Sequence, residues 1–354
     1  SPGYVLSNLG DSDAKWETTK MFNIGFDLTA LSNRLTAGFD FYVKNTSDLL
    51  VPANWSALVG NASKPSINIG DMKNRGVDLS IGWRDKVGEF GYNITANISR
   101  YKNEVTRLGS SDLFNDTRLS KVNITTVGQP VGMFYGYQIE GIYQNEQDVI
   151  SSGVLPYGVA TENDLVASAW VGRYKMKDVN NDGKIDADDR TIIGNPHPDL
   201  TGGFNISLTW RDFDLSTYMY YSIGNDLYKH YEYYTMFGNL QSNYSKDRLA
   251  KSWDPVNNPN GIYPLWTTTS TEGPEAGNES NSNYVQDGSY LRMQTLTLGY
   301  SLPKKLLKKI GFEKIRVYGQ ISNVFTITGY DGLDPEVRSH TSFENEYVSS
   351  DMNK

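Results

Sequence analysis

Residues 178–189 have the side-chain types and the spacing of a loop that binds calcium. Oxygen-bearing side chains stand at loop positions one, three, five, nine and twelve, and position seven would supply a backbone carbonyl. In that order these residues are Asp178, Asn180, Asp182, Asp186 and Asp189, with Lys184 at position seven. Gly183 falls at position six, where such a loop turns sharply. Because Ca²⁺ takes six to eight oxygen ligands in a flexible cage, the pattern predicts an EF-type loop that binds one structural Ca²⁺.

One position departs from this pattern. Position twelve is Asp189, where the EF pattern has Glu, and the shorter side chain would bind through one oxygen or through a water. No helical pattern flanks the loop, so we expect a calcium site inside another fold and not an EF-hand. The alternative interpretation is a turn rich in Asp, Asn and Gly, with solvated carboxylates.

A second candidate site is the aromatic stretch within residues 225–287. Aromatic faces can stack on sugar rings or clasp a peptide, and this predicts substrate contacts at Tyr228, Tyr231, Tyr233, Tyr234, Trp253 and Trp266. The alternatives are packing within the loop or an aromatic girdle at a bilayer boundary.

Other chemistry is not indicated. The sequence has no nucleophile elbow, no P-loop and no histidine-based zinc motif. Its three histidines, His197, His230 and His340, lie far apart in expected loops and are expected at the surface. With no Cys there is neither a disulfide nor a thiolate metal site, and the net charge of −8 argues against nucleic acid as a partner. We therefore expect no enzyme activity.

The segments that would position these sites alternate apolar and polar residues with a period of two, which predicts β-strands. Alternation is clearest at residues 24–28, 35–43, 77–83, 92–98, 204–210 and 213–221, with two further strands at 289–302 and 314–327. Within residues 289–302 the apolar face changes parity between Met293 and Leu296, which predicts a β-bulge.

The connections between these strands differ in length. Those at residues 31–34, 85–91, 211–212 and 303–312 are short, and the last is expected to form a helical turn that ends at Gly311. Those at 46–74, 107–199 and 225–287 are long, and the second could hold further strands near 134–143 and 173–177. Long strands with short turns on one side and long loops on the other are typical of an outer-membrane barrel, in preference to a soluble sandwich or a solenoid.

Four stretches carry a resemblance to a known family: residues 178–198, 203–215, 289–303 and 316–336. In order and spacing they resemble the C-terminal half of a SusC/RagA-type TonB-dependent outer-membrane transporter. The resemblance implies an all-β fold, part of a large antiparallel transmembrane barrel of about 22 strands with long extracellular loops. Residues 1–354 would form the C-terminal half of this barrel, with the plug domain and the closing strand lying outside the chain. The calcium loop, 178–189, would lie within an extracellular loop.

The same resemblance implies a function. The protein would be a nutrient importer in the outer membrane of a Gram-negative bacterium, taking up oligosaccharides or peptides. Its partners would be a SusD-like surface lipoprotein and, through the absent N-terminal part, the TonB-ExbB-ExbD complex. The alternative is a calcium-stabilised surface adhesin or carbohydrate-binding β-protein. Dependence on detergent distinguishes the two, because only barrel strands expose an apolar outer band.

Overall fold

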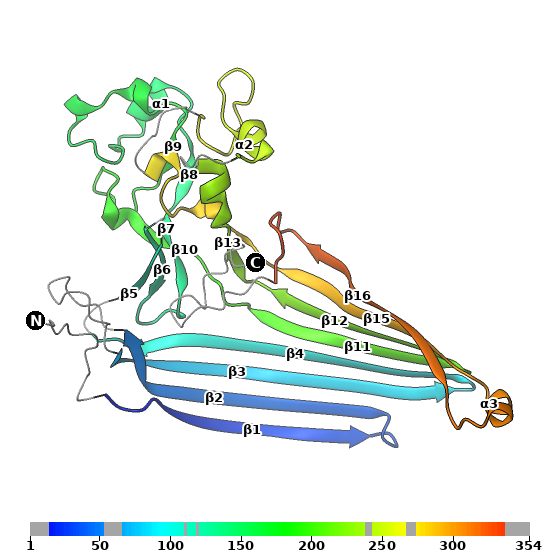
Figure 1. The fold of residues 1–354 in the computed structure, drawn as a ribbon. Helices are drawn as coiled ribbons and strands as arrows, with labels where there is room; N and C mark the ends of the chain where they lie inside the picture. The colour runs from blue at the N-terminus through cyan, green and yellow to red at the C-terminus, as the bar shows by residue number, and fades with distance from the viewer. Residues whose placement is uncertain are drawn as a thin grey trace, which may run out of the picture.

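A long antiparallel sheet dominates the structure, a computed structural model that describes residues 14–52, 66–109, 112–117, 120–237, 243–266 and 274–336 (Figure 1). The sheet has eight strands, each hydrogen-bonded to the next. In spatial order they are β1 (Thr18–Ala30), β2 (Leu35–Pro52), β3 (Ser66–Val87), β4 (Phe90–Arg107), β11 (Leu200–Trp210), β12 (Phe213–Ile223), β15 (Tyr290–Ser301) and β16 (Arg316–Thr328). All eight correspond to strands predicted from the alternation.

The register gives the sheet one apolar and one polar face. Phe26, Phe39, Leu79 and Ile98 lie directly opposite one another on successive strands, so they share a face. On the other face Asp40 lies opposite Asp78, which lies opposite Ser99. Large apolar side chains on the first face stay exposed from β1 to β16. An exposed apolar surface of this extent is typical of a face that another apolar phase covers.

Interruptions of the alternation have a structural cause. The register between β12 and β15 shifts between Met293 and Thr295, which confirms the predicted bulge. The loop predicted at 46–74 is wrong in its described part, because β2 continues to Pro52 and β3 starts at Ser66. Two register shifts near Leu49, with Asp48 in a left-handed conformation, let the pairing continue where the alternation breaks.

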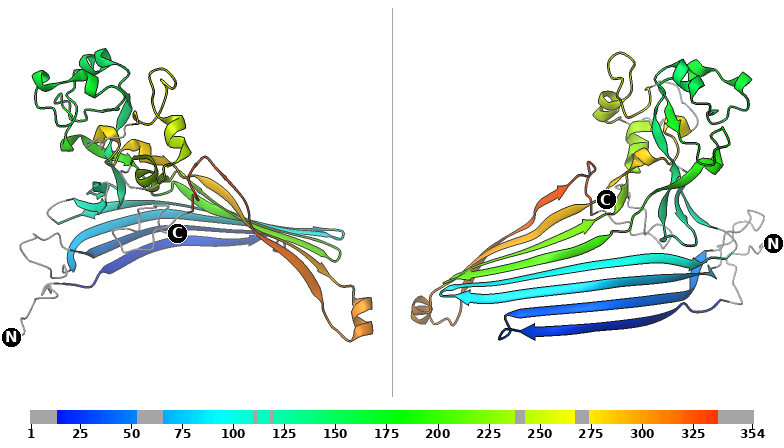
Figure 2. Two further views of the ribbon diagram at one scale, coloured as in Figure 1. Left: turned by 45° about the horizontal axis from the view of Figure 1, so that its top comes forward. Right: turned by 180° about the vertical axis from the view of Figure 1, so that it is seen from behind.

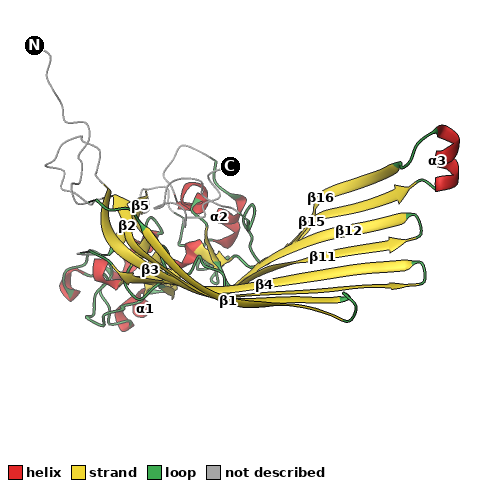
Figure 3. Ribbon diagram, turned by 90° about the horizontal axis from the view of Figure 1, so that it is seen from below, coloured by secondary structure: helices red, strands yellow, loops and turns green. Residues whose placement is uncertain are grey.

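Four short connections lie together at one end of the sheet (Figure 2). They are the turns at 31–34, 88–89 and 211–212, and the connection that contains α3 (Lys304–Ile310). The turn between β3 and β4 is tighter than predicted, because its two strands extend to Val87 and Phe90. Helix α3 ends at Gly311 in the left-handed conformation, as predicted. Figure 3 shows α3 at the opposite end of the sheet from α1 and α2.

Two long connections, 108–199 and 224–289, fold together at the opposite end into what we call the cap (Figures 1 and 2). Its strands are β5 (Leu113–Thr117), β6 (Ser120–Thr125), β7 (Met133–Tyr137) and β10 (Arg190–Gly194) in one sheet, β8 (Ile139–Ile142) with β9 (Tyr174–Met176), and β13 (Asp226–Tyr228) with β14 (Val285–Asp287). Strands near 134–143 and 173–177 thus exist as predicted, but they pair within the cap.

Helical segments of the cap are short. They are α1 (Glu146–Ser151), α2 (Lys246–Lys251), a π-turn at Tyr233–Phe237, and 3₁₀ turns at Glu162–Asp164, Ala167–Ala169, Ala187–Asp189, Pro274–Ala276 and Ser282–Tyr284. Across the described residues, no helix is both long and apolar enough to cross a bilayer.

A buried histidine joins the cap to the polar face of the sheet. The His197 ring lies between the Tyr101 hydroxyl, 3.2 Å from its Nδ1, and the Val131 carbonyl, 2.8 Å from its Nε2. Burial lowers the pKa of His197. The expectation of a surface position is therefore wrong for His197 and also for His230, which is buried as well. His340 lies outside the described residues.

Candidate functional site

The predicted calcium loop connects β9 to β10 and has the backbone of a tight metal-binding turn. Gly183 adopts φ +84°, a left-handed conformation that glycine allows without strain. The Asp178 carboxylate accepts the N–H of Asp182 at 3.2 Å and that of Gly183 at 2.8 Å. Asn180 Oδ1 accepts a bond from the same Asp182 N–H at 3.0 Å. The oxygens of positions one and three therefore point into the turn.

The remaining predicted ligands also bond within the loop. Asp182 Oδ1 accepts the N–H of Lys184 at 3.1 Å, and the Lys184 ammonium lies 2.5 Å from the Asp186 carboxylate. Asp189 is fully buried, and its two oxygens accept the N–H groups of Val179 and Asp186. Asp189 thus links the start of the loop, at Val179, to its end, at Asp186. Its carboxylate oxygens each keep a second lone pair.

This geometry does not by itself establish a metal site. Among the described residues, no group of three or more His, Cys, Asp or Glu side chains is arranged to hold a metal ion. Asn180 and the Lys184 carbonyl belong to the predicted ligand set but not to those residue types. The donor types fit a hard cation such as Ca²⁺, and calcium binding by this loop stays a prediction.

The six aromatic residues predicted to contact substrate divide by burial. Tyr228 and Trp253 are 0% and 2% exposed and belong to the core of the cap, so they offer no ring face to a ligand in this structure. Tyr228 stacks on Tyr284 with ring centroids 5.4 Å apart. Trp253 donates its indole N–H to Gln144. Loop packing, the alternative interpretation, describes these two residues.

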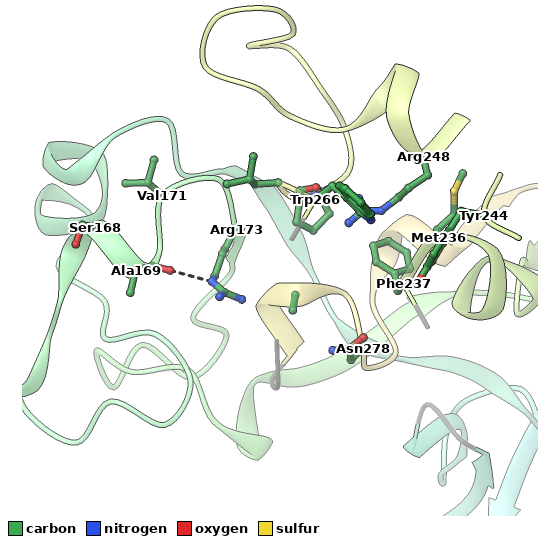
Figure 4. A pocket seen from close by; sticks show the side chains of 13 residues that line it. Ser168, Ala169, Val171, Arg173, Met236, Phe237, Tyr244, Arg248, Trp266 and Asn278 are labelled. Carbon is green, nitrogen blue, oxygen red and sulfur yellow. Dashed lines mark hydrogen bonds between the residues drawn. The ribbon is translucent and has the colours of Figure 1, made fainter. Parts of the chain in front are cut away.

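The other four are more accessible. Tyr231, Tyr233 and Tyr234 are partly buried around the π-turn, and Tyr233 meets Tyr234 edge to face at 5.1 Å. Trp266 is 44% exposed and lines a cavity of about 160 Å³ in the cap (Figure 4). Substrate contact by these four residues stays a prediction.

Two arginines that the sequence analysis did not single out line the same cavity. Arg173 comes from the segment before β9, and Arg248 comes from α2 (Figure 4). Neither forms an ion pair with a described residue, and no Asp or Glu is among the described residues that line the cavity. No local sequence pattern marks them, because 75 positions separate them in the chain.

Arg248 is the more buried of the two. Its Nη1 donates to Ser252 Oγ and to the Pro264 carbonyl, at 2.8 and 2.9 Å. Its guanidinium also lies over the Phe237 ring, 5.6 Å from the centroid. The buried Nε has no hydrogen-bond partner among the described residues. Burial lowers the pKa of Arg248, because charge is costly in an apolar surrounding.

Arg173 is held in place at the cavity wall. Its Nε donates to the Ala169 carbonyl at 2.9 Å, the dashed line in Figure 4. The Glu275 carboxylate acts electrostatically on the Arg173 charge and accepts the Tyr157 N–H at 2.6 Å. Burial raises the pKa of Glu275 to about 7, so this carboxyl is partly protonated at neutral pH. Among the described residues, two guanidinium groups and no carboxylate line the cavity, which gives it a cationic lining.

The fold and the cap define a class of protein. An antiparallel sheet of long strands, apolar on one face and polar on the other, with short turns at one end and folded loops at the other, is a segment of a large transmembrane β-barrel.

Comparison with known proteins finds TonB-dependent receptors that match nearly the whole chain. The chain is 33% identical to TonB-dependent receptor P3 of Formosa agariphila, over 98% of the chain and 34% of that receptor. It is 29% identical to TonB-dependent receptor SusC of Bacteroides thetaiotaomicron, over 93% of the chain and 30% of SusC. A structure of the RagAB peptide transporter superimposes with a TM-score of 0.74 and 27% identity, covering 94% of this chain and 34% of that one. No family model matches.

The chain is a homologue of part of the SusC/RagA-type TonB-dependent receptors, as the sequence analysis predicted. It spans about a third of the length of the relatives that it matches. These relatives are receptors and transporters, not enzymes, in agreement with the sequence prediction.

Proposed function

We propose that this chain forms part of the barrel wall and the external mouth of an outer-membrane nutrient importer of a Gram-negative bacterium. The observation that carries the proposal is the two-faced sheet of long strands, which superimposes on the RagAB peptide transporter over 94% of the chain. The apolar face would meet lipid and the polar face would line the lumen. Because short turns belong to the periplasmic side of such barrels, the cap would lie outside the cell.

In this proposal the imported nutrient is an oligosaccharide or a peptide, and its uptake is energised through a TonB-ExbB-ExbD complex. A SusD-like surface lipoprotein would cover the mouth and meet the cap. Support comes from the similarity to a protein named SusC and to a complex named RagAB.

The cationic cavity narrows the substrate class. A buried guanidinium without an acidic partner, a second one across the cavity and the Trp266 ring together suit a carboxylate attached to a flat or cyclic group. A uronic acid residue of an oligosaccharide meets this description, and so does the C-terminus of a peptide whose last residue is aromatic or proline. We propose that the cavity holds such a carboxylate during uptake.

Uptake of labelled substrate by intact cells tests the function. Cells that produce the complete protein should accumulate peptides from a protein digest or uronate-containing oligosaccharides, and cells without TonB should not. The protein should leave membranes only with detergent. Release of the protein by salt alone would favour the calcium-stabilised adhesin and would contradict the importer.

Arg173→Gln is expected to reduce uptake of substrates with a free carboxylate by about tenfold, since a hydrogen bond to a charged group contributes about 1.5–3 kcal/mol. For amidated peptides of the same sequence, uptake by the Arg173→Gln variant should equal uptake by the wild type. Lys177→Gln is the matched control, because Lys177 is an exposed cation four residues further along the same segment. Equal losses for free and amidated peptides would contradict a carboxylate site.

For the calcium loop we propose that Ca²⁺ binds Asp178, Asn180, Asp182, Asp186 and Asp189 with the Lys184 carbonyl, and rigidifies the connection between β9 and β10. At a calcium concentration a hundredfold above Kd, binding would stabilise the loop by about 2.7 kcal/mol. In the complete protein, Asp182→Ala should speed proteolysis within 178–189 in calcium to the rate that the wild type shows with chelator. Asp188→Ala, which removes a carboxylate from a non-ligand position, should not. Equal proteolysis of the wild type with calcium and with chelator would contradict the site.

A further inference from the structure

The apolar face of the sheet becomes strongly cationic at the cap end of β1 to β4. One row of directly opposed residues across these strands is Phe26, Phe39, Leu79 and Ile98. Two residues nearer the cap, on the same face, the row is Ile24, Phe41, Val77 and Arg100. The next row is Phe22, Val43, Arg75 and Lys102, and the one after it is Lys20, Asn45, Lys73 and Glu104. Five cations and one acid thus directly adjoin the apolar rows.

The arrangement of these cations is unfavourable in the protein alone. Arg75 lies directly opposite Lys102, and Arg100 and Lys102 stand two residues apart on the same face. Like charges at directly opposed positions destabilise a sheet. None of the five cations forms an ion pair with a described residue, Glu104 included. The five are Lys20, Lys73, Arg75, Arg100 and Lys102.

Arg107, in the same strand β4, is neutralised by acidic residues of this chain. Its guanidinium bonds Asp71 at 2.7 and 3.0 Å and lies 3.4 Å from Asp48. In the three rows Glu104 is the one acid; it lies directly opposite Lys73 but forms no ion pair with a described residue. An external anion would therefore relieve the repulsion between Arg75, Arg100 and Lys102.

Beside the patch there is room for a ligand. A cavity of about 420 Å³ is lined by Phe41, Arg75, Arg100 and Lys102, at the place where β4 extends beyond the start of β11. Asp199 also lines it, but its carboxylate is directed at Gly224, where a Cβ would lie 2.5 Å from Oδ2. The cavity also reaches the cap, because Tyr101, Asn195 and His197 line it as well. An occupant would therefore meet the three cations, Phe41 and Val77 from the strands, and polar groups of the cap.

We propose that Arg75, Arg100 and Lys102, with Lys73 and Lys20 at the margin, bind the phosphate groups of a membrane lipid whose acyl chains lie on the apolar rows below. The inference rests on the proposed function, in which this face meets the bilayer. A lipid fits better than free phosphate because the cations adjoin Ile24, Phe41 and Val77 on a continuous surface. Guanidinium groups bind phosphate through paired N–H donors, which suits Arg75 and Arg100.

Binding of lipid A to the complete, delipidated protein in maltoside micelles tests the site. The double variant Arg75→Gln/Lys102→Gln should bind bis-phosphorylated lipid A about thirtyfold more weakly than the wild type. Dephosphorylated lipid A should bind wild type and variant alike. Lys44→Gln/Lys86→Gln is the matched control: it also removes two exposed cations, one from the polar face and one beside a turn at the far end.

Thermal unfolding separates a ligand site from a structural role. Without lipid, the double variant should melt at or above the wild-type temperature, because a like-charge pair is relieved. With bis-phosphorylated lipid A, the wild type should gain more stability than the variant. Equal lipid A affinity for both proteins would overturn the proposal, as would tight binding of inorganic phosphate that displaces no lipid. Solubility of the protein without detergent would contradict the importer proposal itself. If the protein needs detergent but binds bis-phosphorylated and dephosphorylated lipid A equally well, only the lipid site is contradicted.

Discussion

Leu79→Arg is expected to prevent stable insertion of the barrel, whereas Ser80→Arg, one residue further along β3, should be tolerated. Leu79 lies on the apolar face between Phe39 and Ile98 and is 44% exposed. A charged side chain on the lipid face costs about 2–4 kcal/mol at the bilayer midplane. Ser80 lies on the polar face, opposite Asn97, where water can solvate the guanidinium.

Assembly is measured by the amount of protein folded in the outer membrane and by the urea midpoint after reconstitution into phospholipid vesicles. The pair of variants is well matched, since both introduce one Arg into the same strand at exposed positions. Leu79→Arg should lower the midpoint and the folded yield, and Ser80→Arg should leave both close to wild type. Equal effects would mean that the apolar face does not meet lipid.

The main sheet was predictable from the sequence because each strand carries its own signal. Alternation in a stretch such as Leu35 to Val43 is a local property, and the side of the sheet that each residue takes follows from it. Even the bulge near Met293 was visible as a change of parity. Strand ends were less predictable, because the pairing of β2 with β3 beyond Thr46 depends on bulges that interrupt the alternation.

The cap was not predictable in the same way, since its core is assembled from residues far apart in the chain. Phe134 packs on Tyr228, and Tyr174 packs on Phe237, with no period that relates their positions. From the sequence alone, a tyrosine in a long polar loop could equally be a residue that contacts a ligand or a residue of the core. Tyr228 proved to be core and Trp266 to be accessible, and only the three-dimensional packing distinguishes them.

The calcium loop was less predictable from the sequence than the main sheet but more predictable than the core of the cap. Its turn follows from Gly183 and from oxygen-bearing side chains that bond the local backbone, so the conformation could be predicted from the motif. The role of Asp189 could not. Its burial beneath the turn, where it accepts the Val179 and Asp186 N–H groups, depends on the surrounding cap.

Lys229→Met is expected to destabilise the aromatic part of the cap by about 3–5 kcal/mol, the cost of leaving a buried charge without its partner. Lys229 and Glu232 are 6% and 3% exposed, and their charged groups lie 2.6 Å apart. Lys229 also reaches Asp331, just beyond β16, at 3.3 Å. Tyr263 donates its hydroxyl to Glu232 at 3.2 Å. The network thus ties two parts of the cap to the last strand of the sheet.

Replacing both partners should cost less than replacing the lysine alone, because Lys229→Met/Glu232→Gln leaves no buried unpaired charge, and water solvates the exposed Asp331 carboxylate. Lys251→Met is the matched control: it breaks an exposed pair with Asp247, and such pairs contribute only about 0.3–0.5 kcal/mol. Hydrogen exchange of the amides of Trp253 and Tyr263, whose N–H groups bond within the cap, reports the local stability.

The defect of Lys229→Met should also depend on pH. Burial raises the pKa of Glu232 above its ordinary value, and the loss of the neighbouring ammonium raises it further. A carboxyl with a raised pKa in the folded state binds its proton more tightly there than in the unfolded chain, so stability falls as pH rises through that range. Amide protection in Lys229→Met should therefore improve on acidification, while Lys229→Met/Glu232→Gln should show no such gain. Protection that is equally low in both variants at every pH would mean that the lysine acts through packing of its aliphatic chain, not through its charge.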